Sequence, residues 1–250
     1  MKNKKEIIAG IIVIGNEILS GRTQDTNTTT LSIWLNSLGI KVQEVRVIPD
    51  IEKIIITTVN ELRKKFNYVF TTGGIGPTHD DITAMSISKA FNLIYGPHKE
   101  AMSILEKYYK PGEFNEGRKK MACMPTEANL ILNPTSGAPG FNVENVFCLP
   151  GVPSILKSML GGISHSLVGG DPILSHTINL KTVESEIAKP LSDVQDKNKD
   201  VEIGSYPFFR AGKLGVAIVL RSSDKNKIEN CKLEILKFLK EKNVEIIEKD

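Results

Sequence analysis

A glycine-rich stretch from Thr71 to Thr83, TTGGIGPTHDDIT, holds the residues with the clearest chemical meaning. Glycines adopt backbone angles that other residues avoid, and they let main-chain N–H groups come close to a ligand. A helix that begins after the stretch adds its positive end, so phosphate is the natural ligand. We expect Thr83 to be the N-cap of that helix. The substrate-binding residues expected here are Thr72, Gly73, Gly74, Gly76 and Thr78.

Asp80 and Asp81 lie in the same stretch, just before that helix. Two carboxylates beside a phosphate would repel it unless a divalent cation lay between them, and oxygen ligands suit hard ions. We therefore expect Asp80 and Asp81 to be catalytic residues that also bind a metal, Mg²⁺ by default, with Mn²⁺ or Co²⁺ as alternatives. The competing interpretation is that one aspartate caps the helix and the glycines only form a turn. His79 is a phosphate contact, a base or neither.

Further acidic and polar residues follow the first and second predicted strands. Gly15, Glu17, Asp25 and Asn27 come after the first strand, and Asp50 comes after the second. Asn27, or the threonine before it, suits an ordinary helix N-cap. Glu17 and Asp25 are either ligand contacts or surface carboxylates. Asp50 is either the N-cap of the next helix or a catalytic acid of the site.

Two more loops carry small residues that let a ligand approach the main chain. One spans residues 133–140 and the other spans residues 149–153. Turns of proline and glycine are common, so each is a weak signal alone. The substrate-binding candidates in these loops are Ser136, Gly137, Ala138, Pro150 and Gly151.

Strands that alternate with helices must position these loops. Apolar runs predict strands at Ile7–Ile14, Lys41–Ile48 and Tyr68–Thr72, and apolar residues at helical spacing predict helices between them. This order predicts an α/β fold in three layers, with helices on both faces of a mostly parallel sheet. Such sheets bind ligands at the carboxyl ends of their strands. Shorter strands are expected at 130–132 and 146–149, and further helices near 87–91, 102–109, 118–121 and 153–159.

Glycine pairs and the run Gly169-Gly170-Asp171-Pro172 predict a domain boundary near residue 171. The first domain is then 1–170 and the second is 171–250. The second domain is expected to be a small α+β unit, with strands at 173–180, 201–205 and 214–220 and helices at 183–194 and 225–240. We expect the charged run from Asp193 to Asp200 to be a solvated turn.

Composition excludes several classes of protein. Of the 250 residues, 32 are basic and 29 acidic, and 6% are aromatic, which is unlike a dedicated nucleic-acid binder. The three cysteines have no short spacing, so neither a disulfide framework nor a zinc site is expected and the cytoplasm is the default location. The first apolar run is too short to span a membrane. The motifs of P-loop enzymes, nicotinamide dehydrogenases and G-x-S-x-G hydrolases are absent.

The sequence resembles the MoaB/Mog-type molybdopterin-binding domain family. It is most similar to the branch of competence/damage-inducible protein A and of the molybdopterin-binding-like domain of eukaryotic FAD synthase. Nearly the whole chain is covered, and the second domain, including Gly204 to Pro207, is similar to the segment that follows in these proteins. The segments that carry the resemblance are G-x-E-x-L-x-G-x-x-x-D-T-N at 15–27 and the stretches 71–83, 133–141 and 149–153.

By position, the resemblance makes Asp81 the catalytic or metal-linked aspartate of the molybdopterin-activating enzymes and Asp50 their second functional acid. Asp80 belongs to the competence-protein branch. Asn16 stands where many relatives carry an aspartate, a departure that could weaken metal binding. The resemblance also implies a MoaB/Mog-like fold and a homodimer or homotrimer.

The competence-protein branch is associated with metal-dependent cleavage of the diphosphate in dinucleotides such as ADP-ribose and FAD. We therefore expect a metal-dependent nucleotide pyrophosphohydrolase. The alternatives are a molybdopterin-binding protein or adenylyltransferase of molybdenum-cofactor biosynthesis, as in the Mog branch, and a non-catalytic nucleotide-binding module. The expected partner is a small nucleotide or pterin phosphate, with neither nucleic acid nor membrane.

Overall fold

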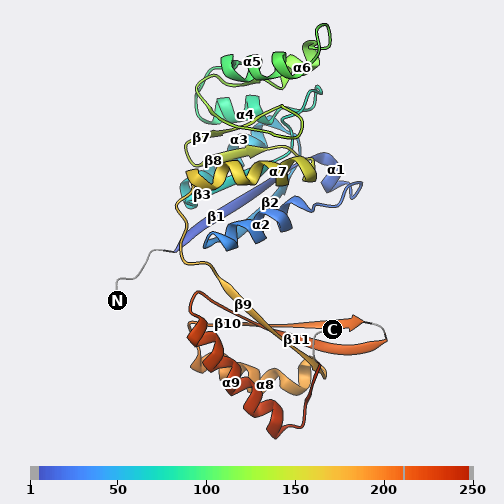
Figure 1. Ribbon diagram of the computed structural model, residues 1–250, viewed down its shortest axis with the longest axis vertical. Coiled ribbons are helices and arrows are strands. Elements are labelled where there is room, and N and C mark those ends of the chain that lie inside the picture. The colour runs from blue at the N-terminus through green and yellow to red at the C-terminus, as the bar shows by residue number, and fades with distance from the viewer. Residues whose placement is uncertain (1–5, 211, 248–250) are drawn as a thin grey trace. The chain divides into compact units, whose positions relative to one another are not determined.

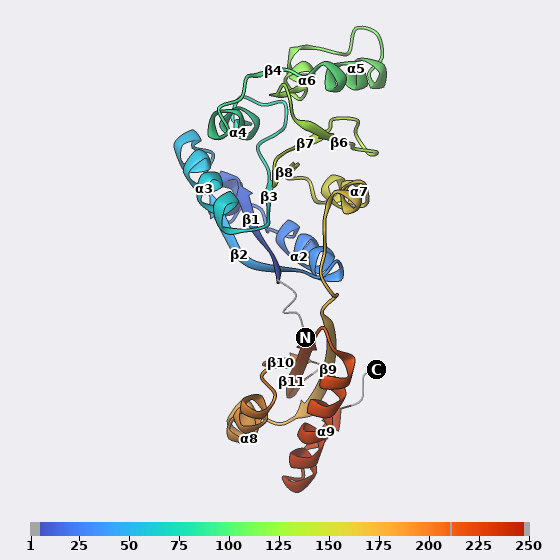
Figure 2. The same ribbon diagram turned by 90° about the vertical axis from the view of Figure 1, so that its left-hand side faces the viewer.

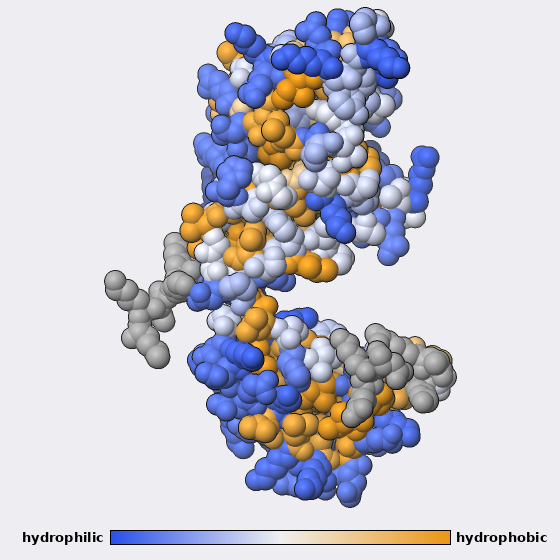
Figure 3. Space-filling view, in the orientation of Figure 1, coloured by the Kyte–Doolittle hydropathy of each residue, from blue (hydrophilic) through white to orange (hydrophobic). Residues whose placement is uncertain are grey.

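The computed structural model describes residues 6–210 and 212–247. The chain divides into two compact units, Met1–Gly170 and Asp171–Asp250, called unit 1 and unit 2 below. Figure 1 labels their helices and strands. Among the described residues, no helix combines the length and the apolar composition that crossing a bilayer requires. On the face that Figure 3 displays, polar and charged residues cover much of each unit, with smaller apolar areas between them.

Unit 1 contains a six-stranded sheet in the order β2-β1-β3-β8-β7-β6. The neighbours β2, β1, β3 and β8 run parallel, and β7 and β6 complete the sheet in antiparallel pairing. This is the mixed α/β architecture with a mostly parallel sheet that the sequence predicts. The strands are β1 (Ile7–Ile14), β2 (Ile40–Ile48), β3 (Tyr68–Thr72), β6 (Asn129–Ile131), β7 (Gly140–Val143) and β8 (Val146–Leu149).

Helices cover both faces of this sheet, as Figure 2 shows. Alternate side chains of β1 point to opposite faces, so Ile12 packs in one core while Ile11 and Val13 pack in another. Helices α3 (Glu52–Lys65) and α4 (Thr83–Ala90) cover the first face. Helices α2 (Asn27–Ser37) and α7 (Pro153–Ile163) cover the second. The three predicted layers are therefore present.

Shorter elements complete unit 1. A two-stranded sheet pairs β4 with β5, and α5 and α6 lie between these two strands in the chain. These elements are α1 (Asn16–Leu19), β4 (Tyr95–Pro97), α5 (Lys99–Tyr108), α6 (Glu116–Lys120), β5 (Cys123–Pro125) and the 3₁₀ turn η1 (Ser164–Ser166).

Unit 2 is a four-stranded antiparallel sheet, β10-β11-β9-β12, packed with two helices. Its core joins alternate strand residues such as Val216, Ile218 and Leu220 to helix residues such as Ile187 and Ile235. The small α+β second domain is therefore present. Its elements are β9 (Leu174–Lys181), α8 (Glu184–Lys197), β10 (Glu202–Arg210), β11 (Lys213–Ser222), α9 (Lys225–Glu241) and β12 (Glu245–Ile247).

Two local predictions are wrong. Thr83 is not the N-cap of α4: that position is Ile82, and Thr83 is the first helical residue and fully buried. The run from Asp193 to Asp200 is not all turn, because α8 continues to Lys197. Charged residues suit the exposed face of a helix, and Lys189 forms an ion pair with Asp193 one turn away.

Candidate functional site

The predicted loops meet where the parallel strands of unit 1 end. The amide of Gly15, after β1, donates to the carbonyl of Ile48 at 3.1 Å, and the amide of Gly73, after β3, donates to the carbonyl of Leu149 at 3.1 Å. These bonds join the loop after β1 to the end of β2 and the loop after β3 to the end of β8. The carboxyl edge of the sheet is therefore the candidate site, as the sequence predicts for this fold.

Asn27 links three of the segments at this edge. Its Nδ2 donates to the Thr72 Oγ1 at 3.3 Å and to the Gly151 carbonyl at 2.7 Å, so the start of α2 is tied to β3 and to the loop after β8. The side chain is 5% exposed, and its Oδ1 is buried with no hydrogen-bond partner. A buried acceptor without a donor is costly, so Asn27 Oδ1 is an unsatisfied polar atom at the start of α2.

The loop between β3 and α4, residues 73–82, is called the glycine loop below. At two of its positions only glycine fits, for steric reasons. Gly73 has φ +101°, and a Cβ there would lie 2.1 Å from the Ile14 carbonyl oxygen. Gly74 has φ +67°, and its Cβ would lie 2.1 Å from the Thr83 Oγ1. Backbone angles and close contacts both exclude larger residues. These glycines thus let the chain turn tightly over the ends of β1 and α4.

A small pocket of about 50 Å³ lies at this edge. Its lining brings together six of the predicted substrate-binding residues, Glu17, Asp25, Asn27, Thr72, Gly73 and Gly151. The other candidates, Gly15, Gly74, Gly76, Thr78, Asp50, Asp80, Asp81, Ser136, Gly137, Ala138 and Pro150, are not in that lining.

Asp25 caps α2, the role that the sequence gave to Asn27 or Thr26. Thr26 occupies the N-cap position without a side-chain hydrogen bond. The Asp25 Oδ1 accepts from the amides of Asn27 and Thr28 at 2.9 and 3.1 Å, and its Oδ2 accepts from the Thr28 hydroxyl. Although Asp25 lines the pocket, its carboxylate is already used by the helix start.

Asp50 does not cap α3, whose N-cap position is Ile51. Its Oδ2 accepts from the Asn16 amide at 2.8 Å, which ties the end of β2 to the loop after β1. Burial raises the pKa of Asp50, and the like charges of Glu17 and Asp80 raise it further, against the lowering effect of the Asn16 amide. The negative charges of Glu17 and Asp80 therefore act on Asp50 at this edge of the sheet.

Asp80 and Asp81 have different surroundings. The Asp81 Oδ2 accepts from the amide of Thr78 at 2.7 Å and from its hydroxyl at 2.5 Å, so Asp81 holds the glycine loop in shape. Asp80 is exposed. Its pKa is lowered mainly by the side chain of Thr78 and further by the charges of His79 and Lys120. Of the two aspartates, Asp80 is the freer to meet a ligand.

Lys120, in α6, is a residue of this region that the sequence did not single out. Its Nζ donates to the carbonyl of Thr78 within the glycine loop. Lys120 is 42 residues from Thr78 in the chain and belongs to a short basic run, which resembles an ordinary solvated surface. Only the way the chain returns from α5 to the sheet brings this lysine to the loop.

The loop between β6 and β7 lies at the same sheet edge but is filled by its own chain. Asn133 Nδ2 donates to the Ser136 hydroxyl at 2.7 Å and to the Ala138 carbonyl at 2.8 Å. The ring of Tyr108 covers Gly137, where a Cβ would lie 2.7 Å from the ring carbons. The polar groups of this loop bond mainly to one another.

A divalent cation fits these residues only together with a phosphate ligand. In residues 6–210 and 212–247, no three His, Cys, Asp or Glu side chains form a group that could hold a metal ion alone. Mg²⁺ is commonly held by one or two carboxylates plus substrate phosphates and water. The neighbouring carboxylates of Asp80, which is exposed, and Asp81, which is partly exposed, fit that manner of binding.

Comparison with known proteins agrees with this architecture. Residues 10–170 match the family described as probable molybdopterin binding domain. The chain belongs to this family. Residues 172–248 match the FAD synthase middle domain. A protein of Archaeoglobus fulgidus is 35% identical to this molybdopterin-binding family member over 233 residues, covering 93% of this chain and 98% of the relative.

Among solved structures, CinA is similar to this family member. The crystal structure of CinA from Thermoplasma acidophilum, a protein of unknown function, aligns with a TM-score of 0.59 and 30% identity, covering 64% of this chain and 98% of that one. MoaB of Thermus thermophilus, a molybdopterin biosynthesis enzyme, aligns with a TM-score of 0.45 and 17% identity, covering 64% and 91%. The predicted MoaB/Mog-type, CinA-like family is confirmed.

Proposed function

We propose that this protein is a metal-dependent nucleotide pyrophosphohydrolase that cleaves the diphosphate of ADP-ribose- or FAD-like dinucleotides. The observation that carries the proposal is the tight glycine turn at the end of β3, which is followed in the same loop by the exposed Asp80 and by Asp81. Carboxylates next to main-chain amides suit a cation bound together with a polyphosphate. The match of residues 172–248 to the FAD synthase middle domain supports a flavin nucleotide among the substrates.

Different residues of the site bind the substrate, hold the cation and activate the water in the proposed reaction. Main-chain N–H groups of the loop from Gly74 to Gly76 bind the diphosphate, and Asp80 and Asp81 hold the cation. Asp50, whose Oδ2 is bonded to the loop after β1, orients the attacking water and accepts its proton. A bound cation neutralises charge on the phosphates.

The reaction is a hydrolysis at one phosphorus of the anhydride. The water oxygen forms a new bond to that phosphorus, and the bridging P–O bond breaks with its electron pair going to the leaving phosphate oxygen. One proton of the water passes to Asp50, and the other is shared between the product phosphates and solvent. ADP-ribose then gives AMP and ribose 5-phosphate, and FAD gives AMP and FMN. The diphosphate of the substrate becomes two phosphate monoesters, and the reaction needs no oxidant and no reactant other than water.

Release of AMP from purified protein tests the proposal. ADP-ribose and FAD are incubated with Mg²⁺, Mn²⁺ or Co²⁺ and with EDTA, and AMP is measured by chromatography. We expect metal-dependent AMP release that Asp80→Asn and Asp81→Asn abolish. Glu127→Gln, a change at an exposed carboxylate elsewhere in unit 1, should leave the rate unchanged. No AMP with any of the three metals would refute hydrolysis.

A second candidate is binding of a pterin phosphate, with or without adenylyl transfer. The match of residues 10–170 to a molybdopterin-binding family favours it. Incubation with molybdopterin and ATP separates the two proposals. Adenylyl transfer consumes ATP and releases pyrophosphate, whereas hydrolysis of ADP-ribose consumes no ATP and releases no pyrophosphate. Ligand-dependent increases in melting temperature without any turnover would instead indicate a binding module.

A further inference from the structure

Lys120 is held against the glycine loop by the way α6 packs. Asn115 caps α6 by accepting from the Arg118 amide at 3.0 Å. The Arg118 guanidinium lies 4.0 Å from the centre of the Tyr109 ring, which fixes the turn to the end of α5. Gly117 faces Pro77, and a Cβ there would lie 3.8 Å from the Pro77 carbonyl oxygen. Helix α6, which carries the basic residues Arg118, Lys119 and Lys120, is therefore anchored over the glycine loop.

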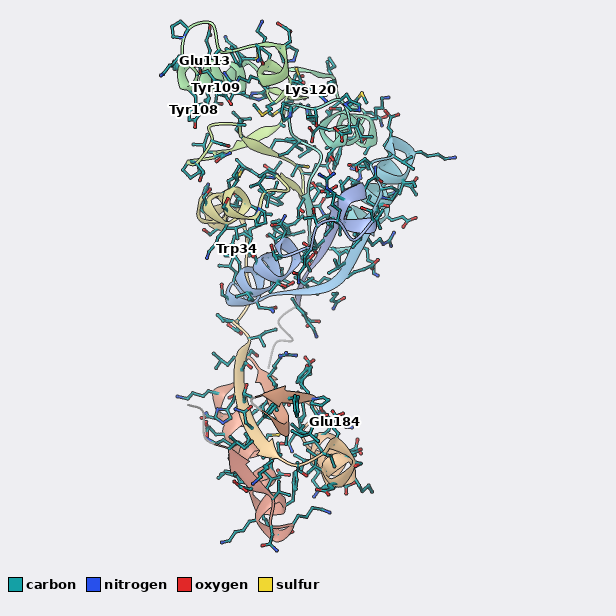
Figure 4. The ribbon with its side chains drawn as sticks, turned by 90° about the vertical axis from the view of Figure 1, so that its right-hand side faces the viewer. Trp34, Tyr108, Tyr109, Glu113, Lys120 and Glu184 are labelled. Carbon is teal, nitrogen blue, oxygen red and sulfur yellow. The ribbon has the colours of Figure 1, made fainter. Side chains whose placement is uncertain are left out.

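The three basic residues of α6 have different partners. Arg118 pairs with Glu113, and Lys119 pairs with Glu116 at 2.7 Å. The Lys120 Nζ donates instead to the neutral carbonyl of Thr78 and lies close enough to Asp80 to add to the lowering of its pKa, after Thr78 and His79. In Figure 4, Lys120 and Tyr108 lie on opposite sides of the segment that contains α5 and α6.

We propose that Lys120 is a phosphate-binding residue that leaves the Thr78 carbonyl to bind a phosphate oxygen of the nucleotide diphosphate. The inference rests on the proposed function for its substrate and adds a recognition residue to it. An ammonium bound to a phosphate makes a charge-assisted hydrogen bond, about twice as strong as one between neutral groups. The lysine side chain is long and flexible, so it can exchange one acceptor for the other without movement of α6.

The structural alternative is that Lys120 only tethers the loop through Thr78. A tether would support loop shape and stability, whereas a phosphate ligand would determine substrate affinity. Lys120→Met removes the charge but keeps most of the length, Lys120→Arg keeps the charge, and Lys119→Met is the matched control on the same turn, because Lys119 pairs with Glu116.

Steady-state kinetics with ADP-ribose and calorimetric titration with inorganic pyrophosphate are the two measurements. For Lys120→Met we expect KM and the pyrophosphate dissociation constant to rise by about tenfold, with a smaller change in kcat, since uniform binding is lost. Lys120→Arg should recover most of the affinity, and Lys119→Met should stay within about twofold of the original protein. The melting temperatures of the three variants should agree within about 2 °C.

Unchanged KM and unchanged pyrophosphate affinity in Lys120→Met would overturn the inference. A fall in melting temperature with Lys120→Arg as defective as Lys120→Met would overturn it too, in favour of the tether. If the original protein binds pyrophosphate but does not release AMP, the hydrolase proposal fails alone, and a selective loss of binding in Lys120→Met still supports the lysine. If it binds no phosphate compound, both proposals fail.

Discussion

The loop after β3 and the loop between β6 and β7 both contain glycine and lie at the carboxyl edge of the unit 1 sheet, but they differ in the polar groups of a site. The loop after β3 has exposed Asp80 and lies beside the unpartnered Oδ1 of Asn27. The loop between β6 and β7 satisfies its polar groups through Asn133 and is covered by Tyr108. Glycine and position are shared, so what distinguishes a candidate site is the set of groups left available to a ligand.

The largest expected difference between the loops comes from adding one methyl group to each. Gly73→Ala places a Cβ 2.1 Å from the backbone oxygen of Ile14 at a positive φ, so the strand end itself must move. We expect a loss of more than about 3 kcal/mol in the free energy of unfolding, measured in urea, and no AMP release.

Gly137→Ala is the matched change in the other loop. It also has a positive φ, +74°, but its new Cβ meets the ring of Tyr108, a side chain that can rotate away. We expect a loss of about 1 to 2 kcal/mol and retained ligand affinity. Equal losses of stability in the two variants would contradict the difference drawn between the loops.

Asn27 and Asn133, both buried, sharpen the same comparison. Asn27→Ala removes the bonds to Thr72 and Gly151, and Asn133→Ala removes those to Ser136 and Ala138. Each should cost about 1 to 3 kcal/mol in urea unfolding, because backbone carbonyls lose their donors. Titration with ADP-ribose should show weakened binding for Asn27→Ala alone. Weakened binding by both variants would place the β6–β7 loop in the site.

The smallest expected effects come from comparing two carboxylates, Glu44 within β2 and Asp50 after it. The pKa of Glu44 is lowered by hydrogen bonds from Lys65 and Arg46, whereas burial and like charges raise that of Asp50. A lowered pKa in the folded state stabilises above the unfolded pKa, and this contribution disappears as pH falls through the folded value. A raised pKa does the reverse, so ionised Asp50 destabilises the metal-free fold at neutral pH.

At pH 7 in EDTA, Glu44→Gln should therefore lower the free energy of unfolding and Asp50→Asn should raise it, each by less than about 1 kcal/mol. Both differences should shrink when urea unfolding is repeated below pH 4, where the carboxyls of folded and unfolded chains become protonated. The same sign for both variants at pH 7 would show that Asp50 is not under electrostatic repulsion.

The sequence predicts the long elements of the fold well, because they carry strong patterns. The apolar run at Ile7–Ile14 and the alternation of strands and helices determine the parallel part of the sheet. The short strands β4, β5, β7 and β12 are not predicted, since three or four residues carry no measurable period and their pairing is set by distant partners.

The sequence predicts where the site lies in the fold, but it does not predict most of the contacts within the site. Strand ends predict where Thr72, Gly73 and Gly151 meet. The sequence cannot show that Tyr108 covers Gly137, or that Lys120 reaches Thr78, because these contacts join residues 29 and 42 positions apart without a motif. Capping also depends on rotamers, which is why Asp25 and not its neighbours bonds the start of α2.

The bridge made by Asn27 has a consequence for how the protein acquires affinity. Its partners Thr72 and Gly151 lie 45 and 124 residues further along the chain, so the pocket does not exist until three distant segments have docked. A ligand held there has no affinity for partially assembled chains. Binding of the proposed nucleotide there would therefore draw the folding equilibrium toward the complete unit and lower the fraction of chains open to proteolysis.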